Sequence, residues 1–476
     1  MNQSLTAYPE YKSAGLPWLA EVPAHWEIKR NKYLFNERDS RSQTGAEELL
    51  TVSQYTGITK RADRRKHENE LLTNAASLVG YKLVEQYDLV INIMLAWNGS
   101  LGISDFNGIV SPAYCVYQPT STDDPRYFHY LFRSPLYKGM YKAVSTGVVD
   151  SRLRLYSDKF FALPALLPPL PEQQRIVAFL DGKTRQIARL LRNKRQLIKL
   201  LTEQKQALIH RAVTQGLDPD APRKDSGVAW LGEVPAHWEV KRLRKVATLN
   251  PSKQESISKS ELEKRVVFLP MENVSTEGEI DCSQQLPIDQ VRNGFTYFRR
   301  NDVIVAKITP CFENGKGACV DELTSEFGFG STEFIVLRAG HELLPSYLYL
   351  ITASPMFRIM GADNMTGAAG QQRVSTDFIR DFQIGVPTTD EQQAILAFVF
   401  SEKKLINQTI ARAQREIELI QEYRTRLIAD VVTGRVDVRY LADAASGLEV
   451  PAEVELDLED EESEEELLIE TEDGRE

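Results

Sequence analysis

The sequence lacks the features that mark membrane proteins, secreted proteins and disulfide-rich scaffolds. Its 476 residues contain no run of about 18 uncharged apolar residues, which a membrane-spanning helix requires. Residues 1–11 have neither the basic nor the apolar region of a signal peptide. No C-x-x-C pair occurs among the four cysteines, so we expect reduced thiols at Cys115, Cys282, Cys311 and Cys319. These absences favour a cytoplasmic protein with no membrane partner.

Motifs for catalysis are also missing. No G-x-x-x-x-G-K-[ST] loop is present, and Gly315-Lys316-Gly317 is too short to hold a nucleotide. Asn250-Pro251-Ser252-Lys253 does not match the N-P-P-Y-like motif of a DNA methyltransferase. Pro219-Asp220 precedes Glu239-Val240-Lys241, as in P-D…E-x-K nucleases, but the same E-x-K occurs at Glu27-Ile28-Lys29 without a preceding P-D. We therefore expect no catalytic residue, metal site or cofactor in this chain.

Charge is distributed unevenly along the chain. The net charge is −10, yet residues 449–476 alone contain 15 acidic residues and one arginine. The rest of the chain carries a net charge of +4, which is compatible with nucleic-acid binding. The composition of 443–476 predicts a disordered acidic tail. Its role is either to maintain solubility or to compete with DNA phosphates for a basic surface.

The chain contains an internal duplication. Residues 15–30 recur at 227–242 with twelve of sixteen positions identical, at an offset of 212. The offset drifts through the middle of each half and then holds at 219 from Arg154/Arg373 to Thr214/Thr433. Insertions in the middle indicate a loop-rich globular body. A constant length at the end of each half indicates a long helix, because one added residue would rotate everything beyond it by about 100°.

Each half ends in a predicted helix of about 42 residues, 172–213 and 391–432, or roughly 60 Å. A capping box, Thr388-x-x-Glu391, precedes the second helix. Apolar positions step by four and three in both helices, which is typical of a coiled-coil seam. The seam positions are Ile187, Leu191, Lys194, Ile198, Leu201, Lys205, Leu208 and Ala212, with their partners Ile406, Ile410, Ala413, Ile417, Ile420, Arg424, Leu427 and Val431. The two helices either pair with each other, which we favour, or pack separately on their own domains.

The apolar stripe of the first helix is wider than a two-helix seam needs. Leu190, Leu197 and Leu200 lie outside the seam, which suggests that a third surface also docks there. We assign partner docking to these three leucines together with Leu201, Ile417 and Ile420.

Several motifs resemble the specificity subunits of type I restriction–modification systems. The opening Trp18-Leu19-Ala20-Glu21-Val22-Pro23-Ala24-His25-Trp26 and the helix start Pro168-Pro169-Leu170-Pro171-Glu172-Gln173-Gln174 resemble this family. So do Met94-Leu95-Ala96-Trp97-Asn98-Gly99 and the stretch from Ala306 to Lys316. The resemblance covers residues 12–440. The second helix start, Pro387-Thr388-Thr389-Asp390, departs from the family wording.

The resemblance implies an α+β fold with two pseudo-twofold-related target-recognition domains separated by an antiparallel coiled coil of two long helices. Its parts would be recognition domains at 12–170 and 227–389, helices at 171–215 and 390–435, a linker at 216–226 and the tail at 443–476. The implied function is non-catalytic recognition of an asymmetric, two-part site on double-stranded DNA. The implied partners are two modification (methyltransferase) subunits and restriction/translocase subunits, with S-adenosylmethionine, ATP and Mg²⁺ bound by those partners.

The densest basic run in the first body is a candidate for DNA contact. It spans residues 59–67 and includes Lys60, Arg61, Arg64 and Arg65. Such cations anchor phosphates or read guanine. The alternative is a solvated helix face.

Two polar loops at equivalent positions are further candidates. Arg152 and Arg154 in the first half correspond to Gln371 and Arg373 in the second, with Gln372 between the latter two. The matching arginines are expected to hold phosphate, whereas Arg152 and Gln371 would prefer different bases. Three more candidates, Asn98, Asn314 and Lys316, lie beside glycines and are either loop-tip contacts or turn residues. Lys307 is a candidate because it lies in the stretch shared with the family.

Aromatic and histidine residues of the duplicated opening have a simpler interpretation. Trp18, Trp26, Trp230 and Trp238 are common to both halves, so we expect packing residues rather than discriminating contacts with bases. The histidines of this opening, His25 and His237, lack metal-ligand spacing and are expected to be structural. Two other classes of function stay open: a coiled-coil scaffold that does not read sequence, and a self-contained methyltransferase or nuclease.

Overall fold

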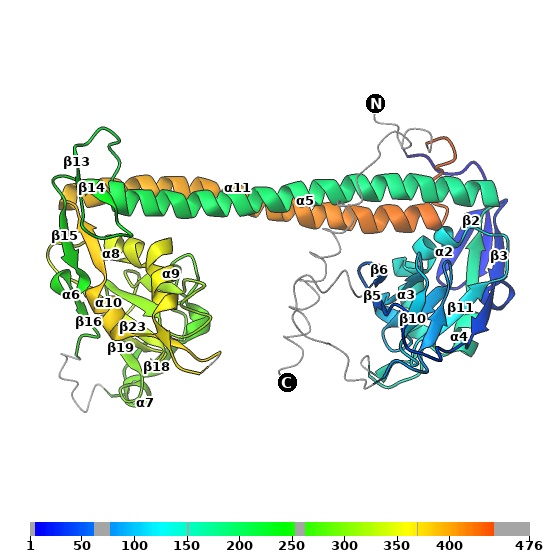
Figure 1. Ribbon diagram of the computed structural model, residues 1–476, viewed down its shortest axis with the longest axis horizontal. Coiled ribbons are helices and arrows are strands. Elements are labelled where there is room, and N and C mark those ends of the chain that lie inside the picture. Colours follow the sequence, from blue (N-terminus) through cyan, green and yellow to red (C-terminus); the bar gives the residue numbers. More distant parts are fainter. Residues whose placement is uncertain (1–4, 61–76, 150–151, 253–261, 369, 442–476) are drawn as a thin grey trace. The chain divides into compact units, whose positions relative to one another are not determined.

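The computed structural model describes residues 5–60, 77–149, 152–252, 262–368 and 370–441. The chain divides into two compact units, each built from segments distant in sequence. The first unit combines Met1–Arg195 with Gln414–Glu476, and the second consists of Gln196–Ala413. Two long helices, α5 (Leu170–Gln215) and α11 (Thr389–Val432), each contribute to both units (Figure 1).

The first unit contains a globular α+β domain. Its central sheet has the strand order β4-β11-β8-β9 and is antiparallel throughout, with Val116 opposite Val90. The elements before α5 are β1 (Tyr11–Leu16), β2 (Leu19–Pro23), β3 (Glu27–Arg30), η1 (Asn31–Tyr33), β4 (Phe35–Arg38), β5 (Leu50–Ser53), β6 (Gly57–Lys60), β7 (Lys82–Val84), β8 (Leu89–Ile91), η2 (Ala96–Asn98), β9 (Leu101–Ile103), β10 (Gly108–Val110), β11 (Cys115–Pro119), α2 (Pro125–Phe132), α3 (Pro135–Val144), α4 (Ser157–Ala162) and β12 (Pro164–Leu167).

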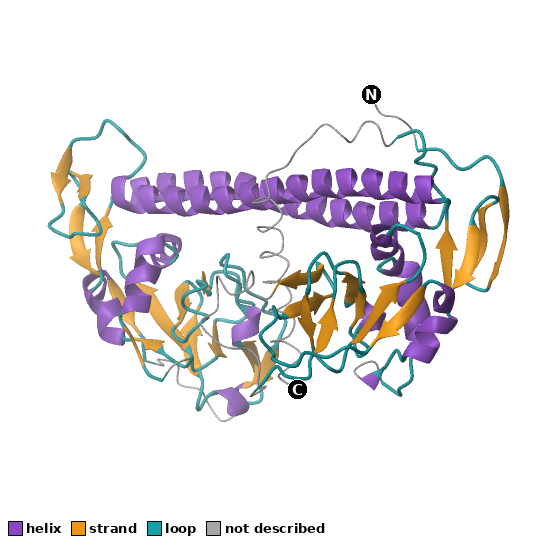
Figure 2. Ribbon diagram, turned by 45° about the vertical axis from the view of Figure 1, so that its right-hand side comes forward, coloured by secondary structure: helices purple, strands orange, loops and turns teal. Residues whose placement is uncertain are grey.

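The second unit repeats this arrangement. Its sheet β16-β23-β20-β21 has the order of the first sheet, with Val336 opposite Ile304 in the central pair. The elements between the long helices are β13 (Arg223–Asp225), β14 (Glu233–Pro235), β15 (Glu239–Arg242), α6 (Leu243–Val246), β16 (Ala247–Leu249), β17 (Arg265–Leu269), η5 (Met271–Asn273), β18 (Gln285–Pro287), α7 (Ile288–Val291), β19 (Thr296–Arg299), β20 (Asp302–Ala306), β21 (Gly317–Cys319), β22 (Phe327–Gly330), β23 (Phe334–Ala339), α8 (Pro345–Thr352), α9 (Pro355–Asp363), β24 (Met365–Thr366), β25 (Arg373–Val374), α10 (Thr376–Asp381) and β26 (Gln383–Val386) (Figure 2).

The two domains differ most in the sheets outside the shared one. The first domain has the two-stranded pairs β5-β6 and β7-β10, whereas the second has a four-stranded sheet of order β18-β17-β22-β19. This is the region in which the sequence offset drifts, so the duplication predicted from sequence is confirmed as a repeated core with divergent additions.

The predicted long helices are confirmed, and they pack antiparallel in each unit. In the first unit, Ile176 near the start of α5 shares a core with Val431 near the end of α11. In the second unit, Ile209 near the end of α5 shares a core with Ile395 near the start of α11. Half of the sixteen predicted seam positions are buried and the others are half-buried; the buried ones are Ile187, Leu191, Lys205, Ala212, Ile406, Ala413, Leu427 and Val431. An ion pair of 2.5 Å between Lys194 and Glu416 also joins the helices.

A cluster of four polar residues, the Glu277 cluster, attaches the second domain to both helices. Lys205 Nζ on α5 lies 2.7 Å from Glu277 Oε1 and 3.1 Å from Asn407 Oδ1. Lys403 Nζ on α11 lies 3.1 Å from the other carboxylate oxygen and donates to the Glu277 backbone carbonyl at 2.8 Å. Burial raises the pKa of the Glu277 carboxyl, but the two lysines outweigh this and lower it to about 2.

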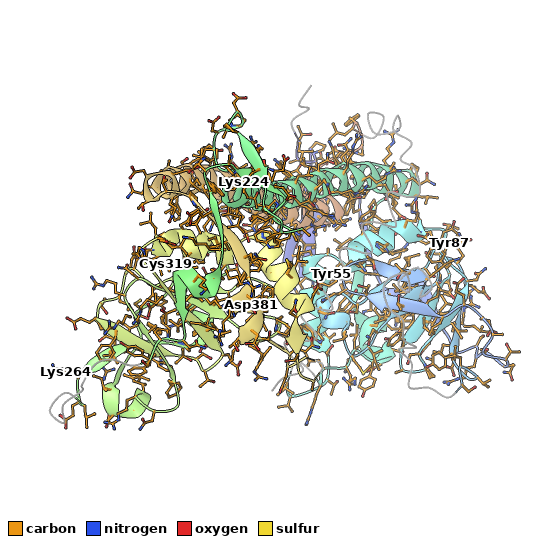
Figure 3. All side chains as sticks on the ribbon, turned by 60° about the vertical axis from the view of Figure 1, so that its left-hand side comes forward. Tyr55, Tyr87, Lys224, Lys264, Cys319 and Asp381 are labelled. Carbon is orange, nitrogen blue, oxygen red and sulfur yellow. The ribbon has the colours of Figure 1, made fainter. Side chains whose placement is uncertain are left out.

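Three details differ from the sequence expectations or refine them. Trp18 is 43% exposed, so its reading as a packing residue is wrong, whereas Trp26 and Trp238 are fully buried. The predicted linker is partly ordered, because β13 pairs with β14. The cysteines are unpaired, and burial of Cys319 (Figure 3) raises the pKa of its thiol to about 12.

Candidate nucleic-acid interface

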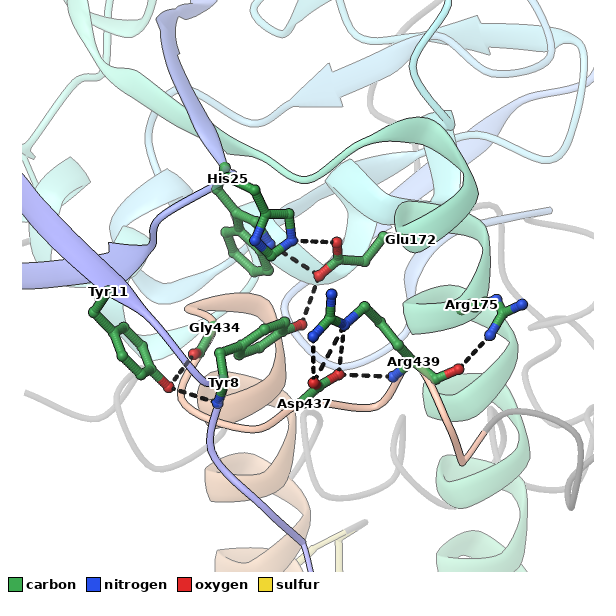
Figure 4. A network of polar contacts seen from close by, with 9 residues as sticks. Tyr8, Tyr11, His25, Glu172, Arg175, Gly434, Asp437 and Arg439 are labelled. Atoms are coloured by element: carbon green, nitrogen blue, oxygen red, sulfur yellow. Dashed lines mark hydrogen bonds and ion pairs between the residues drawn. The ribbon is translucent and has the colours of Figure 1, made fainter.

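A buried carboxylate fixes the start of α5 to the first domain. Glu172, in the first turn, accepts hydrogen bonds from Trp26 Nε1 at 2.9 Å and from the Tyr8 hydroxyl at 2.7 Å (Figure 4). His25 Nε2 lies 2.7 Å from its second oxygen. The Glu172 side chain is only 6% exposed, so these donors replace water around the charge. The repeated tryptophan–histidine pair is therefore structural, as predicted for both residues.

The second unit uses the same arrangement. Glu391 accepts from Trp238 Nε1 at 3.0 Å and lies 2.8 Å from His237 Nε2. Thr388 Oγ1 accepts the Glu391 backbone N–H at 3.3 Å, which is one half of the predicted capping box. The Glu391 carboxylate makes the contacts with the tryptophan and histidine described above, which explains why this glutamate recurs in both halves.

The glutamine after each glutamate also holds its domain. Gln173 accepts the Asp124 backbone N–H at 2.8 Å and donates to the Pro168 carbonyl at 2.9 Å. Gln392 accepts the Leu344 backbone N–H at 2.8 Å and donates to the Pro387 carbonyl at 3.0 Å. Each helix start is therefore hydrogen-bonded to loops of its own domain.

Within each domain, two loops lie side by side, and the two domains carry these loops at equivalent positions. In the first domain, the Leu155 N–H donates to the Ile93 carbonyl at 2.9 Å; in the second, the Val374 N–H donates to the Lys307 carbonyl at 2.9 Å. This bond joins a hairpin, 146–154 or 366–373, to a loop that contains an Asn-Gly pair, 92–100 or 307–316. We call these two segments together the loop pair of each domain. It brings the candidates Asn98, Arg152 and Arg154 onto one pair, and Lys307, Asn314, Lys316, Gln371, Gln372 and Arg373 onto the other.

Each Asn-Gly turn is covered by a cation that sequence reasoning missed. Gly99 and Gly315 have φ values of 103° and 77°, which favour glycine. A Cβ on Gly99 would collide with Lys138, and one on Gly315 would collide with Arg358. These cations lie on α3 and α9 at equivalent positions, and burial lowers the pKa of each. The signal available in the sequence was a cation at the same position of both halves. It was easy to overlook because the residue is lysine in one half and arginine in the other.

The first loop pair exposes a mixed apolar and basic hairpin end. Val148 is 98% exposed, Val149 is 51% exposed, and Arg152 is exposed as well. Arg154 is half-buried, and its guanidinium donates to the Leu153 carbonyl at 3.1 Å. Asn98 is a turn residue here, because its Oδ1 accepts from the Ser100 N–H and hydroxyl at 3.2 and 3.0 Å.

The second loop pair exposes amides. Gln371 and Asn314 are exposed, whereas Lys316 Nζ donates to the Met271 carbonyl at 3.1 Å. Arg373 forms a two-bond pair with Glu333 at 2.9 and 3.0 Å, which lowers the pKa of that carboxyl. Lys307 lines a cavity of about 260 Å³ with Asn250, Thr296 and Thr332. Gln372 is held through its backbone, since its carbonyl accepts the Thr309 N–H at 3.0 Å.

Of the remaining basic candidates, the structure describes only Lys60. Lys60 ends β6, lies 3.3 Å from Glu48 and covers the Phe106 ring at 5.2 Å. Arg61, Arg64 and Arg65 lie outside the described residues, as does the acidic tail. The two loop pairs therefore offer different groups: arginine suits guanine, whereas asparagine and glutamine suit adenine.

The long helices present apolar side chains to the surface. Leu190, Leu197 and Leu200 are 43%, 38% and 51% exposed, whereas the other predicted docking residues, Leu201, Ile417 and Ile420, are half-buried. Sequence reasoning missed further exposed side chains on α11, namely Phe398, Phe400, Leu405, Leu419 and Tyr423. Leu200 and Leu419 are equivalent in the duplication and are exposed to a similar extent, 51% and 47%.

The described part of the chain shows no grouping typical of a metal enzyme. Within it, no group of three or more His, Cys, Asp or Glu side chains could hold a metal ion. The two E-x-K segments are neighbouring ion pairs on strands, with Lys29 Nζ 2.6 Å from Glu27 and Lys241 Nζ 2.7 Å from Glu239. Among the helices described, none is both long and apolar enough to cross a bilayer.

Comparison with known families identifies the domain that forms most of the second unit. Residues 235–419 match the type I restriction modification DNA specificity domain. In this part and in its relatives, the chain is similar to type I restriction–modification specificity subunits, the family that its motifs resemble.

Individual relatives agree with this assignment. The specificity subunit of the type I restriction enzyme EcoAI from Escherichia coli is 33% identical over 215 residues, 44% of this chain. That of EcoEI, also from Escherichia coli, is 33% identical over 199 residues, 41% of this chain. The chain spans only 35% and 33% of the length of these two relatives. The MjaVIII specificity subunit from Methanocaldococcus jannaschii is 24% identical over 375 residues, covering 74% of this chain and 82% of that protein.

A solved structure shares the fold. The chain from "Structural basis underlying complex assembly and conformational transition of the type I R-M system" superposes with a TM-score of 0.63, over 87% of this chain and 99% of that one. Its sequence is only 14% identical, so the likeness concerns the fold alone. The fold class predicted from the sequence is confirmed.

Proposed function

We propose that this chain is the DNA-specificity subunit of a type I restriction–modification complex. Each domain reads one half of an asymmetric, two-part site on double-stranded DNA. The observation that carries the proposal is the loop pair, whose backbone hydrogen bond recurs in both domains while an exposed side chain at an equivalent position changes from Arg152 to Gln371. A repeated scaffold with different donors suits two readers of different half-sites.

The long helices set the spacer between the half-sites in this proposal. α5 has 46 residues and α11 has 44, which at 1.5 Å per residue correspond to about 69 and 66 Å. Half-sites one turn apart on B-DNA have centres about 34 Å apart. Because each helix contributes to both units, its length limits how far apart two readers can bind.

Catalysis belongs to the partners in this proposal. Two modification subunits would bind S-adenosylmethionine and methylate DNA, and restriction/translocase subunits would use ATP and Mg²⁺. The equivalent exposed leucines, Leu200 and Leu419, support docking of two copies of one partner, because each helix offers the same position once. The chain itself contributes no catalytic residue.

Methylome sequencing tests the reading function. A host that carries this chain with its modification subunits should methylate one asymmetric motif with two short halves and a fixed unspecified spacer. Replacing residues 12–160 with those of another family member should change one half only. Methylation with no two-part motif, or a swap that changes both halves, would contradict the proposal.

A second measurement separates the two other classes of function. The lone chain is incubated with DNA and radiolabelled S-adenosylmethionine; transfer of label would show a self-contained methyltransferase. A gel shift with excess random-sequence competitor at fixed salt distinguishes a reader from a scaffold, since non-specific binding is lost to the competitor.

A further inference from the structure

A row of three arginines lies on one face of α5 within the first unit. Arg175, Arg185 and Arg189 are all exposed. At about 100° per residue they fall within roughly 80° of one another around the helix axis. The residues between them on this face, Ala178 and Gly182, are small. We call these three residues the arginine row.

The arginine row occurs in only one of the two duplicated helices. Its counterparts 219 residues later are Ala394, Lys404 and Gln408. Across the whole helices, α5 has ten basic and three acidic residues, whereas α11 has six and seven. Six of the eight seam positions are apolar in both helices, whereas the row is basic throughout only in α5, so the shared pairing does not account for the row.

The described chain ends beside this row. The Arg175 guanidinium donates a hydrogen bond to the Arg439 backbone carbonyl (Figure 4). Arg439 in turn is held by Asp437 through bonds of 2.7 and 3.0 Å, and its guanidinium covers the Tyr8 ring at 5.0 Å. Residues after 439 therefore start from the first turns of α5.

We propose that the arginine row binds the acidic C-terminal segment of its own chain, residues 449–476. This segment contains 15 acidic residues and, like the row, has no counterpart in the other half. The eight residues from 441 to 449 can span at most about 26 Å. Arg175 and Arg189 lie about 21 Å apart along the helix axis. Charge and reach thus match an intramolecular contact. In this contact the acidic segment, a polyanion, occupies the arginine row when no DNA is present.

Zero-length carbodiimide cross-linking of the full chain tests this contact. The reagent joins lysine amines to carboxylates, and Lys183 is half-buried, lies between Arg175 and Arg189 along α5, and is about 80° from Arg175 around the helix axis. We expect cross-links from Lys183 to the glutamates of 449–476 at low salt, detected by mass spectrometry. At 1 M salt, where the Debye length falls to about 3 Å, they should be lost.

Two charge-reversal variants make the experiment specific. In R185E/R189E the Lys183 cross-links to the tail should fall at least about fivefold, because the local concentration that binding provides is removed. K404E/Q408E, at the equivalent positions of α11, should leave them unchanged. Equal effects of the two variants, cross-links that persist at 1 M salt, or no cross-links in the wild type would overturn the proposal.

A mixture of ¹⁴N- and ¹⁵N-labelled protein identifies the occupant. Cross-links within one isotope only support the chain's own tail, whereas mixed-isotope cross-links would show a second copy and refute it. No DNA is present in any arm, so this result is independent of whether the domains read DNA.

Discussion

Replacing Glu277 by glutamine should loosen the contact between the second domain and the long helices. The change keeps the shape of the side chain but removes the charge that faces Lys205 and Lys403. The Lys205 side chain is 8% exposed and would face only uncharged acceptors, the introduced amide oxygen and Asn407. An uncompensated buried charge is costly, so the cluster should open more often.

The size of the effect follows from the geometry and the pKa. Lowering the pKa of Glu277 from 4.5 to about 2 would be worth about 3 kcal/mol for a fully buried group. The side chain is 38% exposed, and solvent screening reduces this to about 1–2 kcal/mol. Because the folded-state pKa lies below the unfolded one, the contribution is complete above about pH 4.5 and is lost as the pH falls toward 2.

Hydrogen exchange of the backbone around Glu277 is the suitable assay. The Ser275 and Asp281 amides donate within this loop at 2.9 Å each, and they should exchange about 5- to 30-fold faster in E277Q at neutral pH. The exposed neighbour Glu279 provides a matched control, and E279Q should behave as the wild type. Equal exchange in the two variants, or a difference that persists at pH 2, would refute the reasoning.

Three further outcomes are expected. Glu172→Ala should cost about 2–4 kcal/mol in unfolding followed by near-ultraviolet circular dichroism and Glu391→Ala about 1–2, because the second carboxylate is 25% exposed rather than 6%; equal losses would contradict this. Gly315→Ala should lower thermal stability by about 1–3 kcal/mol more than Gly294→Ala, since both have positive φ but only the first would collide with a neighbour; similar losses would argue against the covered turn. Arg152→Gln should alter one half of the methylated motif at a cost of about 1–3 kcal/mol for the original base and leave the other half unchanged.

Periodicity and repetition allowed much of the fold to be predicted. The offset of 219 and the four–three spacing predicted α5 and α11 to within two residues at each end, because a long helix cannot absorb insertions. The burial of Trp26 and Trp238 also followed from their recurrence. Trp18 recurs as Trp230 but is exposed, which shows that repetition alone does not guarantee burial.

Contacts between distant segments were harder to predict. Glu172 and Trp26 were each recognised as repeated, but nothing in one sequence says that they touch across 146 residues. Glu277 lies in the stretch where the sequence offset drifts, so no repetition marks its carboxylate. Lys138 and Arg358 are different residue types. Each lies on a helix that is distant in sequence from the turn that it covers. The loop-pair candidates were placed together by the fold, while their contacts with bases stay a prediction.

The composition of the first unit has a consequence for how the protein is made. Tyr11 donates to the Gly434 carbonyl at 3.0 Å, and the backbone of Thr6 pairs with Asp437. The ribosome therefore completes the second unit, which ends at Ala413, before it has supplied the last helix turns that the first unit needs. The domain that is synthesised first is therefore completed last. Until the end of α11 leaves the ribosome, the part of α5 that packs against it in the first unit lacks its partner helix.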